Sequence, residues 1–306
     1  MRNRLQRRYA RYWQLYVFLL IPVVYILIFS YYPMLGLQIA FKKFNFKGGI
    51  WGSPWVGLYQ FRKFLNAYQF KLVLKNTLVL SAYSILAAFP FPILFALTLN
   101  VIQAKKFKKF AQTVTYIPHF ISVVVLVGML MQIFHPLTGV YGVLARALTG
   151  STPADLLANP STFPHMYVWS GVWQGFGYNS IIYLAALSGV SAELHEAAEI
   201  DGASRLQRVI HIDFPAILPT VTIMLIMRMG SVMTLGFQKI YLMQNTLNLS
   251  TSEVISTFVY KKGLASGAGN DYSYSTAIGM FNSVINLLLL VCVNGVSRKL
   301  SENSLW

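Results

Sequence analysis

The chain alternates between long uncharged stretches and short segments that hold its charged residues. A membrane-spanning helix needs about 20 mainly apolar residues, and most of the uncharged stretches reach that length. Residues 15–29 do not alternate between apolar and polar positions, which argues against an outer-membrane barrel. The pattern predicts an all-α polytopic protein with one transmembrane domain over residues 1–306. Its six spans are expected near residues 13–33, 76–100, 113–135, 165–188, 214–235 and 275–297.

Composition supports this class. Of the 306 residues, 56% are hydrophobic and 11% are charged, whereas soluble domains carry about 25% charged residues. The net charge of +16 does not indicate a nucleic-acid partner, because no soluble domain is left over to hold one. Lys and Arg instead flank membrane helices at the anionic lipid surface of the cytoplasmic side.

The basic clusters set the expected orientation. Five arginines precede the first span, and four lysines lie between 105 and 109, so both termini and residues 189–213 are expected in the cytoplasm. The first apolar run is longer than that of a signal peptide and lacks a cleavage site, so we expect it to be retained. Residues 42–75 conflict with this rule, since they carry seven Lys and Arg and no acid on the outer side. An apolar stripe from Phe61 to Leu72 predicts a helix along the membrane surface there.

The most distinctive polar segment is residues 189–213. It holds five of the nine acidic residues of the chain, between positions 193 and 213. Ala192–Ile200 and Ala203–Ile212 are predicted to be two short helices. Gly202 tolerates the bend between them, and Pro215 is expected to start the next span.

The spacing of this segment resembles the EAA loop of bacterial ABC importer permeases. The match consists of Glu196, Ala197, Ala198, Gly202, Ile212 and Pro215, with Phe214 where the family usually has Leu. The resemblance implies that the loop forms coupling helices that dock into a cleft of a cytoplasmic ATPase subunit. Glu196 would face the ATPase, and Gly202 would allow the turn.

Weaker matches extend the resemblance over most of the chain. They look like the branch of permeases for complex carbohydrates, related to the lipopolysaccharide-type and oligosaccharide permeases, and start at Trp55, Asn76, Ile181, Val254 and Ser304. The resemblance implies a bacterial inner-membrane complex with a second homologous permease, an ATPase dimer and an extracytoplasmic substrate-binding protein. The chain has no Gly-x4-Gly-Lys-Ser/Thr motif, so ATP and Mg²⁺ are expected on the partner ATPase. We expect no enzyme activity and no cofactor in this chain.

Two other classes stay open at this level. The stretch from His195 and Glu196 to Glu199 lies one residue away from the zinc-protease motif H-E-x-x-H. An ion-coupled secondary transporter would also be a polytopic membrane protein, and would work without ATPases. The lone Cys292 can form no internal disulfide and leaves the redox compartment open.

Polar residues inside the predicted spans are candidates for the substrate pathway. Amides and guanidinium groups can hydrogen-bond sugar hydroxyls, and aromatic rings can cover sugar C–H faces. An intramembrane arginine should face a cavity or an interface, unless its span ends earlier and the side chain reaches the surface. For the amides, helix–helix hydrogen bonding is the competing interpretation. The candidates are Trp173, Gln174, Tyr178, Asn179, Arg228, Asn282 and Asn286. The loops 136–164 and 238–273 are candidates for contact with a substrate-delivering protein.

Overall fold

A computed structural model describes residues 12–300. The N-terminal arginines and the match that starts at Ser304 lie outside the described residues. The described chain consists of helices and their connections, with an isolated antiparallel bridge between Lys42 and Trp55. It divides into two compact units, one of residues up to 66 with 261–280, the other of 67–260 with residues from 281 on. The expected single transmembrane domain stays a prediction.

The first unit is built from the N-terminal apolar helix and a set of short helices. Its elements are α2 (Trp13–Ile26), the π-helical η1 (Leu27–Tyr31), α3 (Tyr32–Met34), the 3-10 helix η2 (Leu35–Phe41), α4 (Gly49–Gly52), α5 (Tyr59–Leu65), the π-helical η5 (Lys261–Ala265), the 3-10 helix η6 (Gly267–Gly269) and the first turns of α19 (Tyr272–Leu300).

The second unit holds most of the predicted spans and the 189–213 loop. Its elements are α6 (Tyr68–Ala88), α7 (Pro90–Val101), α8 (Lys105–Tyr116), η3 (Ile117–Phe120, 3-10), α9 (Val123–Ile133), α10 (Val140–Thr149), α11 (Phe163–Asn179), α12 (Ile181–Leu187), α13 (Ala192–Ile200), α14 (Arg205–Arg208), η4 (Val209–Asp213, π-helical), α15 (Phe214–Gly230), α16 (Phe237–Met243), α17 (Leu249–Ser252), α18 (Ile255–Tyr260) and the rest of α19.

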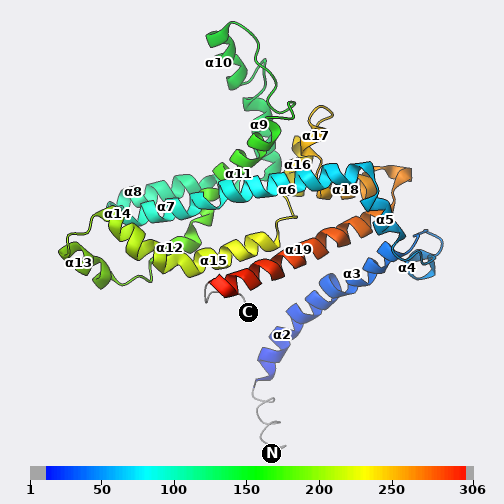
Figure 1. The fold of residues 1–306 in the computed structure, drawn as a ribbon, viewed down its shortest axis with the longest axis horizontal. Helices are drawn as coiled ribbons and strands as arrows, with labels where there is room; N and C mark the ends of the chain where they lie inside the picture. Colours follow the sequence, from blue (N-terminus) through cyan, green and yellow to red (C-terminus); the bar gives the residue numbers. More distant parts are fainter. Residues whose placement is uncertain (1–11, 301–306) are drawn as a thin grey trace, which may run out of the picture. The chain divides into compact units, whose positions relative to one another are not determined.

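In this second unit α11 packs against α6, α7 and α8, and α12 packs against α7 and α15. Figure 1 shows α7 and α8 on the left of the view, and both contact α11. One buried cluster forms around Phe163 and Val172 of α11, and another around Ile93 and Ile217. Small residues let such helices approach closely in a membrane, where van der Waals packing replaces hydrophobic burial as the driving force.

The predicted all-α membrane class is confirmed by these helices. Four of them are long and apolar enough to span a membrane: Trp13–Phe41, Tyr68–Val101, Arg205–Gly230 and Tyr272–Lys299. They correspond to the predicted first, second, fifth and sixth spans. The predicted fourth span is divided between α11 and α12, which are separated by Ser180.

The predicted third span, 113–135, is not straight. Its two halves, Lys105–Phe120 and Val123–Ile133, meet at 98°. Ser122 starts the second half as an N-cap, with its side-chain oxygen accepting a hydrogen bond from the Val125 N–H. The carbonyl of Ile121 at the bend accepts a hydrogen bond from Gln174 Nε2 at 2.9 Å. Side-chain partners therefore satisfy backbone groups that a straight helix would pair internally.

The second span also begins earlier than the hydropathy pattern indicates. The apolar stripe from Phe61 to Leu72 predicted one surface helix, but α5 ends at Leu65 and α6 starts at Tyr68. Ala67 between them has an extended backbone, with ψ 140°. The second half of that stripe therefore belongs to the first turns of the spanning helix.

Candidate functional site

The first helix of the 189–213 loop forms as the sequence predicts. Ser191 caps α13, because its side-chain oxygen accepts a hydrogen bond from the Glu193 N–H at 3.2 Å. Gly202 ends the turn after α13 with φ at +79°, the left-handed region that favours glycine. The N–H of Ala203 then donates to the carbonyl of Ala198 at 2.9 Å. A Cβ on Gly202 would meet no atom within 4 Å, so only the backbone conformation favours glycine there.

The second helix of the loop differs from the prediction at both ends. It starts at Arg205 rather than Ala203, because Ser204 and Gln207 form a reciprocal capping box. The Ser-x-x-Gln spacing was visible in the sequence and could have located this start. The helix also continues into α15 without a break before Pro215, through a π-helical turn in which the Phe214 N–H donates to the carbonyl of Val209. The wider turn accommodates a proline that cannot donate a backbone hydrogen bond.

A buried carboxylate ties this loop to the membrane helices. Asp213 is 2% exposed. Its Oδ1 accepts a hydrogen bond from Asn100 Nδ2 of α7 at 3.1 Å and forms an ion pair with His195 Nε2 of α13 at 3.2 Å. Asn100, His195 and Asp213 are called the Asp213 latch below. The latch joins the loop helix α13, the end of α7 and the start of α15 through one oxygen atom.

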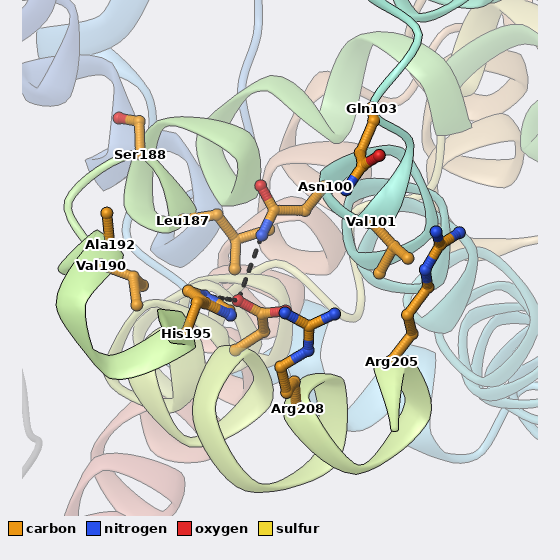
Figure 2. Close-up of a pocket in the computed structure, with 11 residues that line it drawn as sticks. Asn100, Val101, Gln103, Leu187, Ser188, Val190, Ala192, His195, Arg205 and Arg208 are labelled. Atoms are coloured by element: carbon orange, nitrogen blue, oxygen red, sulfur yellow. Dashed lines mark hydrogen bonds and ion pairs between the residues drawn. The ribbon is translucent and has the colours of Figure 1, made fainter. Parts of the chain in front are cut away.

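A second ion pair connects the two helices of the loop. Arg208 Nη1 lies 3.3 Å from Glu199 Oε2 and so connects α14 to α13. Arg205, Arg208 and the Asp213 latch line a cavity of about 360 Å³ (Figure 2). Two ion pairs therefore fix the helices of the loop relative to their neighbours. From the sequence, the loop was recognised only as rich in acidic residues.

The face of the loop that carries the EAA-like residues is exposed. Glu196 and Ala197 lie on the surface. Leu194, Ala197 and Ile200 follow one another at i, i+3 and i+6, which places them near one face of α13. All three are exposed, Ile200 at 88%. Uncovered apolar side chains on a polar loop are typical of a surface that docks against another protein.

The histidines of the loop are engaged in local hydrogen bonds. His195 forms its ion pair with Asp213, and His211 Nδ1 makes a hydrogen-bond contact of 2.9 Å with the carbonyl of Gln207. Within residues 12–300, no group of three or more His, Cys, Asp and Glu side chains is placed to hold a metal ion.

Two of the seven pathway candidates share a cavity within the spans. Asn179 of α11 and Arg228 in the last turn of α15 both line a cavity of about 310 Å³. Tyr183 and Ser231 line it too. This cavity, called the membrane cavity below, offers a guanidinium, an amide and two hydroxyls, which are donors suited to an oxygen-rich ligand. Tyr183 and Ser231 were absent from the sequence prediction, since neither stands out in an apolar run.

Two other candidates make hydrogen bonds to backbone groups. Gln174 holds the bend at Ile121, as described above. Asn286 Oδ1 accepts from the Met233 N–H at 2.9 Å, and its Nδ2 donates to Thr234 Oγ1 at 2.9 Å. These contacts match the interpretation of helix–helix hydrogen bonding in a membrane.

The remaining three lie at separate places. Trp173 lines an apolar cavity of about 400 Å³ between α9 and α11. The ring of Tyr178 stacks on His119 with centroids 3.7 Å apart. The Asn282 side-chain oxygen is buried without a hydrogen-bond partner in the described part of the chain. The assignment of these residues to a substrate pathway stays a prediction.

Lys239 is a buried cation that sequence reasoning missed. It lies in α16, between the last two long spans, and is 8% exposed. Its Nζ donates to the Tyr167 carbonyl at 2.9 Å and lies 5.0 Å from the centroid of that ring. Desolvation lowers the pKa of Lys239 to about 8. Its only sequence signal is a lysine flanked by apolar residues at 237 and 240.

Comparison with known proteins identifies the family. The family model described as "Binding-protein-dependent transport system inner membrane component" matches residues 88–302. Protein LplB of Bacillus subtilis (strain 168) is 40% identical over 95% of this chain and 91% of its own length. The polygalacturonan/rhamnogalacturonan transport system permease protein YteP of the same organism is 38% identical, over 100% of this chain and 94% of its own.

Solved structures agree with this assignment. A chain of a bacterial ABC transporter involved in the import of the acidic polysaccharide alginate has a TM-score of 0.89 at 37% identity, covering 97% of this chain and 99% of its own. A chain of that kind of transporter, in complex with an alginate pentasaccharide-bound periplasmic protein, has a TM-score of 0.89 at 36% identity. It covers 99% of this chain and 100% of its own length. The chain therefore belongs to the inner-membrane components of binding-protein-dependent transport systems, the permeases whose EAA loop its residues 196–215 resemble.

Proposed function

We propose that the chain is the permease subunit of an ATP-driven importer that moves an oligosaccharide delivered by an extracytoplasmic binding protein. The family match and the sugar permeases among the relatives support this function. The structural observation that carries it is the continuity of α15. This helix begins next to Asp213 of the latch and carries Arg228 of the membrane cavity in its last turn. At 1.5 Å per residue it extends about 25 Å, so one rigid element connects the two sites.

The coupling step follows from this connection. In the proposed complex, the exposed face of α13 docks against an ATPase subunit, with Glu196 at the contact. Movement of α13 is passed through His195 and Asp213 to α15, and through Asn100 to α7. These two helices bring Arg228 and Pro92 to the membrane cavity. Closure of the ATPases would thereby reshape the cavity and switch access between its two sides.

The membrane cavity favours a sugar that carries a carboxylate. Arg228 supplies a permanent positive charge, and a guanidinium can bind a carboxylate with two parallel hydrogen bonds. Asn179 and Tyr183 add donors and acceptors for hydroxyl groups. The relative YteP is a polygalacturonan/rhamnogalacturonan transport permease, and the similar solved transporter is involved in the import of the acidic polysaccharide alginate. An acidic oligosaccharide is therefore the proposed substrate class.

The proposed assembly contains four further subunits. They are a second homologous permease, two ATPase subunits that bind ATP and Mg²⁺, and the binding protein, while this chain holds no cofactor. It lies in the inner membrane of a bacterium as one transmembrane domain, with both termini in the cytoplasm. Uptake by this chain alone under an ion gradient would instead support a secondary transporter.

One experiment tests substrate and coupling together. The complete complex with its binding protein is reconstituted in vesicles, and ATP hydrolysis and uptake are measured with oligogalacturonates, alginate oligomers and neutral maltooligosaccharides. Acidic oligomers should stimulate hydrolysis and accumulate inside, and neutral ones should not. Stimulation by none of these sugars would contradict the proposal.

A pair of variants on α13 isolates the coupling role. Glu196→Ala should reduce co-purification of the ATPase subunits and stimulated hydrolysis together. Glu193→Gln is the matched control, because Glu193 is an exposed acid in the first turn of the same helix and outside the EAA-like match. Equal assembly and transport in Glu196→Ala and wild type would count against the docking role.

A further inference from the structure

The first unit contains a cavity that neither the coupling nor the membrane pathway uses. It measures about 640 Å³, within the range of about 300–1,000 Å³ that small-molecule sites occupy. It lies between the segment from Lys43 to Lys63 and the residues that lead into α19. The bond from the Phe44 N–H to Ser273 Oγ at 2.9 Å and the Lys63–Asp271 pair at 2.8 Å hold these segments together. It is called the outer cavity below.

Aromatic rings form one wall of the outer cavity. Phe44, Phe46 and Tyr272 all line it, and each ring meets the other two edge to face at 5.5–5.8 Å. Phe46 is nevertheless 80% exposed. Rings fixed by one another but open on one side offer a preformed platform, which costs little conformational entropy when a ligand stacks on it.

One buried side-chain oxygen at the outer cavity has no hydrogen-bond partner in the described part of the chain. Gln60 is 4% exposed and lines the outer cavity. Its Oε1 has no hydrogen-bond partner within residues 12–300. A buried acceptor without a donor destabilises the fold, and a ligand hydroxyl that donates to it removes that cost. Because the terminal torsion of glutamine is soft, a small rotation can turn this oxygen toward a hydroxyl in the cavity.

The charge at the outer cavity is positive. Lys43, Lys63 and Asp271 line it, and Asp271 is paired with Lys63. The surplus charge is that of Lys43. Residues 42–66 of this unit hold five Lys and Arg and no acid, and they are part of the stretch that conflicts with the positive-inside rule on the outer side. A negatively charged ligand would neutralise this excess of positive charge when it binds.

We propose that the outer cavity is a binding subsite for a carboxylate-bearing sugar on the extracytoplasmic side of the permease. The inference rests on the proposed function. Phe46 and Tyr272 cover the apolar face of a sugar ring, Gln60 accepts from one of its hydroxyls, and Lys43 pairs with its carboxylate. The subsite receives one sugar unit of the incoming oligosaccharide.

The test is titration of trigalacturonate into the whole complex in nanodiscs, without the binding protein. Lys43→Met should weaken binding about tenfold, the value expected for loss of one charge-assisted hydrogen bond. Gln60→Leu should weaken it to a similar degree. The methyl ester of trigalacturonate, which has no charge, should bind weakly to the wild type and be insensitive to Lys43→Met.

Lys47→Met is the matched control. Lys47 is an exposed lysine of the same segment, next to Phe46, and it does not line the outer cavity. Its variant should bind trigalacturonate like the wild type. Lys43 is itself exposed, so its substitution does not threaten the fold and the test does not depend on Gln60→Leu alone.

Two outcomes would overturn the inference. One is equal affinity of trigalacturonate for wild type, Lys43→Met and Gln60→Leu. The other is that Lys43→Met spares sugar affinity and weakens the affinity of the sugar-free binding protein, which would make the cavity a protein contact. Either result leaves the proposed function standing if the complex still imports acidic sugars. If the complex imports no acidic sugar, the proposed transport function is contradicted, whereas the subsite is judged by the affinities of the variants alone.

Discussion

The Asp213 latch makes a quantitative prediction for the 189–213 loop. Asp213→Ala removes the acceptor for Asn100 Nδ2 and the ion-pair partner of His195 Nε2. Hydrogen bonds to a charged group contribute about 1.5–3 kcal/mol each, and removal of one partner of a buried pair costs about 3–5 kcal/mol. The shared oxygen argues for the lower end, about 3 kcal/mol. Because about 1.4 kcal/mol is a factor of ten, the population with α13 detached should rise about 100-fold.

Hydrogen–deuterium exchange measures that population directly. In the purified complex, the amides of α13 should exchange about 100-fold faster in Asp213→Ala than in wild type, provided that exchange follows local opening. Asp213→Asn keeps one acceptor oxygen without the charge and should fall between the two. Stimulated ATP hydrolysis should decline in the same order, because movement of α13 is no longer passed to α15.

A control and a cycle separate the latch from general destabilisation. Asp201→Ala removes an exposed acid of the same loop and should leave exchange in α13 unchanged. Combining Asn100→Ala with Asp213→Ala should cost less than the sum of the single variants, since both break the same bond. Wild-type exchange in α13 of Asp213→Ala would refute the latch.

Three further predictions concern packing, backbone and charge. Gly177→Ala places a Cβ 2.3 Å from the Thr115 backbone oxygen. The variant should therefore destabilise the α8–α11 contact by about 1–3 kcal/mol, which is measured as a lower melting temperature in detergent. An unchanged melting temperature would contradict the close approach of the two helices. Gly202→Ala should cost about 1 kcal/mol from the left-handed backbone alone, and should reduce stimulated ATP hydrolysis. Gly150→Ala, at φ +71°, should cost as much stability and spare the coupling. Lys239→Met should raise stability at pH 7 by about 3 kcal/mol, because the pKa near 8 means that the folded protein holds a desolvated charge below that pH. The stability gained by Lys239→Met should shrink as pH rises from 8 to 10, because Lys239 of the folded wild type loses its proton before Lys239 of the unfolded chain does. A gain in stability that is independent of pH would show that the charge of Lys239 is not the cause.

Much of the fold and part of the site are encoded locally in the sequence. Apolar runs identify the long helices because a bilayer requires a length of uncharged residues, wherever the neighbours lie. The helix Ala192–Ile200 and the turn at Gly202 follow from capping residues and from glycine's backbone freedom, which act within a few positions. Lys239 shows the limit, since its surroundings in sequence do not reveal that it is buried.

Only the tertiary structure shows how distant residues combine. Asn100 binds Asp213 across 113 positions of the chain. Asn179 and Arg228 line one cavity because α12 packs against α15 and follows directly on α11. Such pairs are selected by how helices approach one another, and hydropathy carries no information about that. The sequence by itself determined a helical membrane protein with one acid-rich polar loop, for which it predicted a coupling role. The packing of its helices decided that a buried carboxylate fastens this loop, and that one helix leads from it to an arginine in the membrane.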